Sequence, residues 1–358
     1  MTFENRITQL VRRWDEEELF SLSTNVGEQH DIPIENTYRD TYMYLESLVK
    51  FRFVPYLNDE IQGFWRKLWI WINQFETNDE KKLAFKIASS ITFITEDQIR
   101  HLQEVCFQEK LRFHLLDEII IQKKLVPYSY EDAIAYFEEK LDECLIVALT
   151  DSARYNQFVH INGLENHSRL GLKSIGVLVH PDIISTSEVV NKLKKRYENK
   201  RILIIIEDFC GSGKTFITDL VRISTHYDNF LKVYFCPYII TDHAEKTIRR
   251  FARKFTPNII LEILPGMTIS EFMRAFSRSS VLFSYEEQKE IKKICVKYHK
   301  KYFSDHKFIG KPRSYPYGYR NGQLLLVLQS NCPNHTLPII WAQENGWKPL
   351  FKRIQRYA

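Results

Sequence analysis

Residues 201–215 read RILIIIEDFCGSGKT, and the rest of the chain is interpreted around this stretch. Its apolar run, 202–206, has the length and composition of a strand that is buried on both faces of a sheet. Two acids follow, and then a turn of small residues from which successive backbone N–H groups can point at an anion. A helix is expected from about Thr215, and its N-terminus adds partial positive charge. The stretch therefore predicts a strand, a phosphate-binding turn and a helix.

Apolar runs of the same kind recur in the later part of the chain and alternate with helix-like stretches. The runs are 145–149, 175–179, 202–206, 232–235 and 259–263, and the helix-like stretches are 187–197, 215–224 and 244–255. Buried strands that alternate with helices are typical of an α/β fold with a mostly parallel sheet flanked by helices. Such sheets bind ligands beyond the carboxyl ends of their strands, so functional residues are expected after these runs.

The first part of the chain has a helical periodicity instead. Apolar residues recur there at the spacing of one helix face, as in the series from Ile7 to Trp14. We therefore expect an α-helical N-terminal module at 1–140. An α/β domain is expected at 141–358, with its last residues forming a hood over the site.

Composition and cysteine spacing restrict the class of protein. Of the 358 residues, 44% are hydrophobic and 27% are charged, which is typical of a folded protein and excludes a disordered or collagen-like chain. The six cysteines form no C-x-x-C pair, so we expect no metal ion held by protein side chains. The start, MTFENRITQL, lacks the pattern of a signal peptide, and no apolar run is long enough to span a bilayer. We expect a cytoplasmic protein without membrane contact.

Positive charge is concentrated between Lys289 and Arg320. This segment has ten Lys or Arg residues against only two acids, Glu290 and Asp305, and aromatic residues are interleaved with them. Such a composition is typical of a surface that binds nucleic acid through phosphates and stacked bases. A solvated helix face of lysines has the same composition, so both interpretations stay open.

Two kinds of phosphate loop fit the stretch after residue 206. Gly213, Lys214 and Thr215 match the end of the Walker A loop, G-x-x-x-x-G-K-[ST], but Asp208 occupies the position of its first glycine. A carboxylate there would face phosphate oxygens. Two adjacent acids instead suit vicinal hydroxyls, because an ionised carboxylate accepts O–H donors. A P-loop phosphotransferase is therefore the less favoured interpretation.

The stretch resembles the 5-phosphoribosyl diphosphate (PRPP) motif of type I phosphoribosyltransferases, in which a hydrophobic strand, two acids and a small-residue loop follow one another. The resemblance implies that Glu207 and Asp208 hold the ribose hydroxyls and serve as the catalytic acids. It also implies that the loop holds the 5-phosphate; the loop residues are Gly211, Ser212, Gly213, Lys214 and Thr215. One departure is Gly211, because the purine enzymes of this family have an aspartate there.

A second loop is implied by the same resemblance. In phosphoribosyltransferases an early strand ends in a loop that presents a cation and hydrogen-bond donors to pyrophosphate. The matching stretch here is 145–154, LIVALTDSAR, with Ser152 as the donor and Arg154 as the cation. Mg²⁺ would bridge the pyrophosphate and would be held by ligand oxygens and water.

The C-terminal segment points to a narrower family. Residues 331–341 read NCPNHTLPIIW and residues 346–353 read GWKPLFKR. Together with the two loops, they resemble the phosphoribosyltransferase-like effector domain of bacterial conflict and anti-phage defence systems, including retron-associated ones. The block either clamps the C-terminus onto the sheet or lines the pocket through Asn334 and Trp341.

Two functions from different classes follow. The first is a toxin effector that binds PRPP or a related ribosyl phosphate such as a nucleotide, and acts at the ribose anomeric carbon. Partner proteins of a defence operon, such as a reverse transcriptase or an ATPase, would hold it silent. The alternative is a catalytically inert subunit of a defence complex, which senses a nucleotide or binds nucleic acid through residues 289–320. The sequence alone does not separate an enzyme from a binding module.

Overall fold

The computed structural model describes residues 2–24, 38–57, 61–166, 174–304 and 315–353. The chain divides into two compact units, which are treated separately below. We call residues 97–271 the sheet unit, and residues 1–96 together with 272–358 the terminal unit.

The sheet unit is built on a parallel sheet with the strand order β2-β3-β4-β5. The strands are β2 Cys144–Ala148, β3 Ile202–Cys210, β4 Lys232–Thr241 and β5 Ile260–Ile263, and a short strand β6, Met267–Ile269, also pairs in parallel with β4. Nearly every side chain of the central strands β3 and β4 is buried, as their continuous apolar runs predict. The mostly parallel α/β fold with flanking helices is therefore confirmed.

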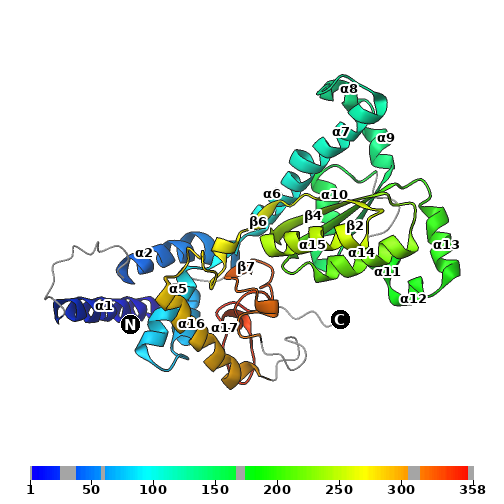
Figure 1. The fold of residues 1–358 in the computed structure, drawn as a ribbon. Coiled ribbons are helices and arrows are strands. Elements are labelled where there is room, and N and C mark those ends of the chain that lie inside the picture. The colour runs from blue at the N-terminus through cyan, green and yellow to red at the C-terminus, as the bar shows by residue number, and fades with distance from the viewer. Residues whose placement is uncertain (1, 25–37, 58–60, 167–173, 305–314, 354–358) are drawn as a thin grey trace. The chain divides into compact units, whose positions relative to one another are not determined.

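Helices surround these strands, and Figure 1 shows α10, α14 and α15 alongside them. The helical elements are α6 Glu96–Glu104, η2 Val105–Leu111, α7 Arg112–Lys123, α8 Tyr130–Ile134, α9 Phe137–Asp142, η3 Asp151–Ala153, α10 Tyr155–Ile161, α11 Gly176–Val179, α12 Pro181–Ile184, α13 Ser187–Arg196, α14 Lys214–His226 and α15 Asp242–Phe255. The strand expected at 175–179 is wrong, because this run forms the short helix α11 and only Ser174 makes an isolated bridge to Ala148. Three of its apolar side chains, Ile175, Leu178 and Val179, are buried all the same, which explains the misleading pattern.

The two units do not follow the boundary expected between residues 140 and 141. Helices α7 and α9 are part of the sheet unit. There Glu118 forms an ion pair with Lys140 at 3.0 Å and another with Lys232, the first residue of β4, at 2.7 Å. Lys140 is only 3% exposed, so these contacts belong to the interior of the unit. The change from helical to strand periodicity marks the start of the sheet and not the limit of the compact unit.

The terminal unit is mainly helical and draws on both parts of the chain. Its elements are α1 Phe3–Thr24, α2 Tyr38–Leu48, η1 Val49–Phe53, α3 Val54–Leu57, α4 Ile61–Ile72, α5 Asn78–Ser89, β1 Thr92–Ile94, η4 Glu271–Met273, α16 Tyr285–Tyr298, η5 His299–Phe303, η7 Tyr319–Asn321, β7 Leu326–Leu328 and α17 Pro338–Trp341. The N-terminal helical region is confirmed. Strands β1 and β7 form a separate two-stranded parallel sheet with Phe93 opposite Val327. One apolar core joins the early helices to the C-terminal segment, and it includes Trp65, Trp71 and Trp347. No helix among the described residues is long and apolar enough to cross a bilayer.

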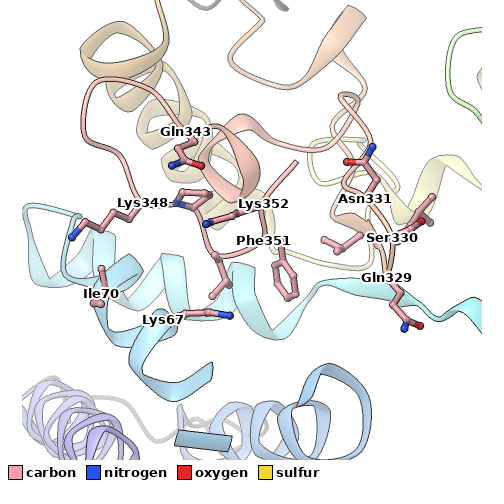
Figure 2. A pocket seen from close by; sticks show the side chains of 13 residues that line it. Lys67, Ile70, Gln329, Ser330, Asn331, Gln343, Lys348, Phe351 and Lys352 are labelled. Atoms are coloured by element: carbon pink, nitrogen blue, oxygen red, sulfur yellow. The ribbon is translucent and has the colours of Figure 1, made fainter. Parts of the chain in front are cut away.

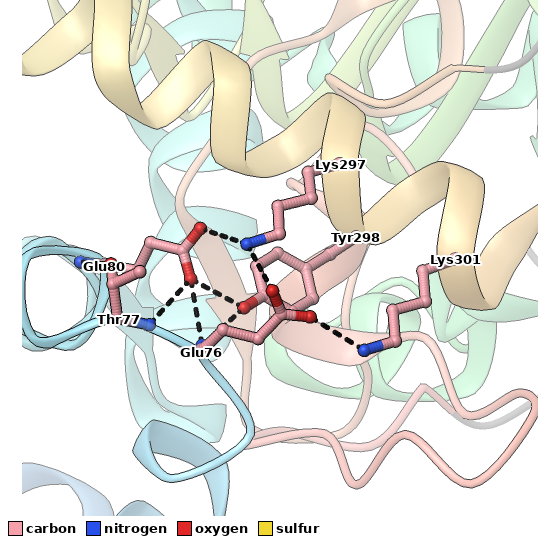
Figure 3. A network of polar contacts seen from close by, with 6 residues as sticks. All are labelled: Glu76, Thr77, Glu80, Lys297, Tyr298 and Lys301. Carbon is pink, nitrogen blue, oxygen red and sulfur yellow. Dashed lines mark hydrogen bonds and ion pairs between the residues drawn. The ribbon is translucent and has the colours of Figure 1, made fainter.

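A polar network attaches α16 to the start of α5 (Figure 3). Lys297 contacts Glu76 and Glu80, each at 2.7 Å, and Lys301 contacts Glu76 at 2.8 Å. The hydroxyl of Tyr298 donates to Glu80 at 2.8 Å and accepts the backbone N–H of Glu76 at 2.7 Å. The two lysines lower the pKa of Glu76 to about 2. The network therefore joins residues that are more than two hundred positions apart in the sequence and fixes part of the terminal unit.

We predict that the hydroxyl of Tyr298 stabilises the terminal unit. The Tyr298→Phe variant keeps the buried ring but loses both hydrogen bonds, so its free energy of unfolding should fall by about 1–3 kcal/mol. Urea denaturation of the full chain measures this as a lower midpoint. The matched control is Tyr285→Phe on the same helix. Because Tyr285 is 77% exposed, loss of its hydroxyl should leave the urea midpoint unchanged. Equal midpoints for the two variants would contradict the prediction.

Candidate functional site

The register of the sheet brings the two predicted loops together. Ala148, the last residue of β2, lies opposite Ile206 of β3, so the residues that follow β2 run beside the two acids. Strand β3 continues past the acids and stays paired with β4 through Cys210, which lies opposite Ile240. The acids are therefore part of the strand, two residues before its end, where the backbone holds them firmly.

Hydroxyl groups from the loop after β2 contact both carboxylates. Thr150 Oγ1 donates to Glu207 Oε1 at 2.8 Å. Ser152 Oγ lies 3.2 Å from Glu207 Oε1 and 3.0 Å from Asp208 Oδ1, and its single hydrogen can serve only one of them at a time. The backbone N–H of Phe209 also donates to Asp208 Oδ1, at 2.6 Å. Ser152 thus meets the acid pair directly, and its role toward pyrophosphate stays a prediction.

The electrostatics of the pair are set by burial. Glu207 is 3% exposed, and its Oε2 atom has no hydrogen-bond partner among the described residues. Burial raises the pKa of Glu207 well above its ordinary value, and the neighbouring charge of Asp208 raises it further. The raised pKa favours the protonated form of Glu207, which can donate a hydrogen bond. Asp208 beside it is half-buried.

A hydrogen bond from a buried tyrosine fixes the backbone of the loop that carries Arg154. The hydroxyl of Tyr238, on β4, donates to the backbone oxygen of Ala153 at 2.5 Å, and the ring is fully buried. Arg154 follows with a positive φ of 52°, a left-handed conformation that is uncommon for a residue with a side chain. Neither Thr150 nor Tyr238 was expected at the site from the sequence. Thr150 is a polar residue directly after a buried strand, which was a usable signal, whereas nothing in the sequence marked Tyr238.

The glycine-rich turn has the geometry of an anion cradle. Gly213 has a φ of +73°, and a Cβ atom there would lie 2.7 Å from Ile248 Cγ1, so only glycine fits. Thr241 supports the turn, because its hydroxyl donates to Gly211 O at 2.8 Å while it caps α15 by accepting from the N–H of Ala244. Helix α14 begins at Lys214, one residue before the expected start. Its first N–H groups have no acceptor within the helix, so they are available to an anion.

Three side chains of the predicted phosphate loop are available as well. No hydrogen bond or ion pair joins the side chains of Ser212, Lys214 or Thr215 to any other residue of the described part of the chain, and Lys214 and Thr215 are exposed. Two hydroxyls and an ammonium group thus accompany the N-terminus of α14. This arrangement can bind a phosphate group through neutral and charged donors together.

The C-terminal pocket candidates belong to the terminal unit. Trp341 is 2% exposed, and its Nε1 donates to Thr336 O at 2.8 Å. The backbone oxygen of Asn334 accepts the N–H of Tyr319 at 2.7 Å. These contacts give the block a structural role within the terminal unit. The expected clamp onto the parallel sheet stays a prediction. That Asn334 or Trp341 lines the ligand pocket stays a prediction.

Ion pairs within the fold account for part of the positive charge of the segment 289–320. Lys293 contacts Glu290 at 2.7 Å, and Lys297 and Lys301 belong to the network with Glu76. Residues 305–314, which include three of the predicted cations, lie outside the described residues.

For metals, the described residues contain no group of three or more His, Cys, Asp or Glu side chains that could hold an ion. Mg²⁺ bound through ligand phosphates stays a prediction.

Paired acids beside a glycine-rich turn, within a parallel α/β sheet, are features of a phosphoribosyltransferase-like domain. Comparison with protein-family models matches residues 68–353 to the PRTase-CE family. The chain therefore belongs to the PRTase-CE family, and the match runs through both compact units. Searches of curated proteins and of solved structures found no match.

We predict that Glu207 makes the fold less stable as the pH rises. The pKa of this carboxyl is raised in the folded state. Above its ordinary pKa of 4.5, the folded protein therefore binds more protons than the unfolded chain, and the free energy of unfolding falls with increasing pH. The Glu207→Gln variant keeps an acceptor for Thr150 and has no proton to release. Its stability relative to the unchanged protein should therefore increase between about pH 5 and about pH 8.

Urea denaturation at the two pH values measures this difference. The matched control is Glu188→Gln, because the side chain of Glu188 is 75% exposed and pairs only with Lys192 in the described residues. The relative stability of the control should not change with pH. A Glu207→Gln variant whose relative stability is the same at both values would show that the carboxyl is already ionised in the folded protein.

Proposed function

We propose that the sheet unit binds PRPP or a related ribosyl phosphate, such as a nucleotide, and acts at the ribose anomeric carbon. The observation that carries this proposal is the pairing of two unlike acids, Glu207 and Asp208, with an anion cradle three residues further along the same strand and turn. A ribose 5-phosphate has vicinal hydroxyls at one end and a phosphate at the other. The site offers matching groups in the same order.

The proposed binding follows from the donors and acceptors available. The phosphate would lie in the turn 211–215, where backbone N–H groups, two hydroxyls and Lys214 can donate to its oxygens. Asp208 would accept a ribose O–H. Protonated Glu207 can donate to one ribose oxygen and accept from another hydroxyl, which an ionised carboxylate cannot do. A buried acid with a raised pKa is thus suited to a diol, which both donates and accepts.

The proposed chemistry is the breaking of the bond between the anomeric carbon and its leaving group. The leaving group takes the bonding electron pair, and positive charge develops on the ribose ring before the acceptor forms the new bond. The carboxylate of Asp208 would stabilise that charge electrostatically. Mg²⁺ bound to the pyrophosphate oxygens would supply charge neutralisation for the leaving group. Ser152 and Arg154 are the residues of this chain proposed to bind the departing anion.

The proposed biological role is that of a toxin effector in anti-phage defence systems, including retron-associated ones, restrained by partners such as a reverse transcriptase or an ATPase. Its support is the resemblance of the C-terminal block and the membership in the PRTase-CE family. A second candidate is a catalytically inert nucleotide-sensing subunit. Gly211 favours it, because the position that holds an aspartate in purine phosphoribosyltransferases has no acid here.

We predict that PRPP binding depends on Asp208. Calorimetric titration of PRPP with Mg²⁺ should give saturable binding to the unchanged protein. In Asp208→Asn the affinity should fall by about tenfold or more, because a hydrogen bond to a charged group contributes about 1.5–3 kcal/mol. The control is Asp228→Asn, since the Asp228 side chain is 85% exposed in the same unit. ATP binding that is lost in Lys214→Glu, without PRPP binding, would favour a P-loop, and binding of neither ligand at the loop would favour the complex-assembling subunit.

We predict that the same carboxylate is needed for toxicity. Expression of the chain without partner proteins should arrest bacterial growth, and Asp208→Asn at the same protein level should remove the effect. Colony counts after induction measure it, with Asp228→Asn as the control that stays toxic. Toxicity that persists in Asp208→Asn, while PRPP binding is lost, would separate the toxic effect from the ribosyl-phosphate site.

A further inference from the structure

A cavity lies within the terminal unit, and part of its lining comes from the C-terminal stretches 331–341 and 346–353. It has a volume of about 510 Å³ and is lined by 13 residues, which Figure 2 shows as sticks. The lining comes from the end of β7 with the turn that follows it, from α4, from Gln343 and from the stretch 348–352. The volume falls in the range of small-molecule sites, about 300–1,000 Å³. The carboxyl end of a parallel strand is also where such sites recur.

The walls of this cavity are held by contacts that do not involve a ligand. Phe351 packs edge-on against Phe53 at 5.3 Å between ring centroids, and its backbone N–H donates to Ile340 O. The side chain of Gln74 makes two hydrogen bonds to the backbone of Lys348, accepting from its N–H at 2.7 Å and donating to its oxygen at 2.8 Å. The cavity is therefore largely preformed, which lowers the cost of ordering a ligand.

The charge of the lining has a single sign. Three lysines contribute to it, Lys67, Lys348 and Lys352, whereas none of the described residues that form the lining is an aspartate or a glutamate. The ammonium groups of Lys348 and Lys352 make no hydrogen bond or ion pair with the described part of the chain, in contrast to Lys297 and Lys301 nearby in the fold. Such a lining selects an anion, and ammonium groups bind phosphates as point charges.

The remaining lining is suited to a planar, polar-edged group. In the view of Figure 2, Lys67 and Lys348 lie on one side of Phe351, and Gln329 and Asn331 lie on the other. The Oε1 atom of Gln329 accepts the backbone N–H of Glu96 at 2.8 Å, which sets the orientation of its amide and leaves the Nε2 hydrogens as donors. Buried Leu350 and Phe351 also line the cavity, and we call them its apolar floor.

We propose that this cavity is a nucleotide-binding site, distinct from the ribosyl-phosphate site of the sheet unit. Lys348 and Lys352 bind the phosphates, the apolar floor contacts the face of the base, and the amide of Gln329 donates to its edge. A bare polyanion would leave the floor and the amide unused, and an uncharged nucleoside would leave the lysines unused. The proposal does not depend on the function of the sheet unit, because it rests on residues of the terminal unit alone.

The test uses the full chain with ATP as the probe. All titrations are made in a Lys214→Glu background, in which the negative side chain at the N-terminus of α14 prevents phosphate binding in the sheet unit. ATP should bind this protein saturably at one site. Adding Lys348→Gln and Lys352→Gln should weaken ATP binding by about tenfold or more, since each removes a charge-assisted contact.

The matched control adds Lys289→Gln and Lys293→Gln instead, which remove the same charge from exposed positions on α16. The control should bind ATP as the background does, and thermal denaturation should show that both variants are folded. Adenosine and inorganic triphosphate should each bind more weakly than ATP. The proposal is overturned if ATP does not bind the background, if both pairs of substitutions weaken it equally, or if triphosphate binds as tightly as ATP. It is also overturned if single-stranded RNA, but not ATP, binds and loses affinity in the Lys348/Lys352 variant.

Discussion

The parallel register of β3 between its two neighbours is the constraint on which the candidate site depends. Pairing of Ala148 with Ile206 places the loop after β2 beside the acids, and pairing of Cys210 with Ile240 carries the strand to the edge of the glycine turn. A shift of one residue would turn Glu207 and the apolar residues before it to the opposite faces of the sheet. Because those residues are fully buried, the apolar core enforces the register, and the register in turn positions the polar groups.

The site is built at some cost to the fold. Glu207 is buried with one oxygen atom that has no partner in the described residues, and Arg154 has a left-handed backbone conformation. Each of these features destabilises the folded state on its own. The central strands offset them with a continuous apolar core, and Tyr238 and Thr241 add hydrogen bonds directly beneath the two loops. The functional edge of the sheet is thus supported by polar contacts that the rest of the sheet does not need.

Much of the sheet unit could be predicted from the sequence, because its determinants are local. The β-branched run, the acids and the glycine turn are consecutive, so strand β3, the turn and helix α14 follow from one segment. The contact between Thr150 and Glu207 depends on a register between distant strands, and Tyr238 looks like any other core aromatic residue. The two-stranded sheet of β1 and β7 was not predicted, since three-residue strands leave no periodic pattern. The grouping of the chain into units was also missed, because periodicity reports secondary structure and not which surfaces pack together.

The division of the chain has a consequence for how the protein folds. The sheet unit is one continuous segment, whereas the terminal unit needs residues from both sides of that segment, with Thr92 paired to Leu326. During synthesis the sheet unit can therefore complete its contacts while the C-terminal residues are still being added. Part of the apolar surface of the early helices stays exposed until Trp341 and Trp347 have been synthesised. Contacts between residues so far apart in the sequence form slowly. The last step of folding is then the completion of the terminal unit, so newly made chains carry a finished 211–215 turn before they are fully folded.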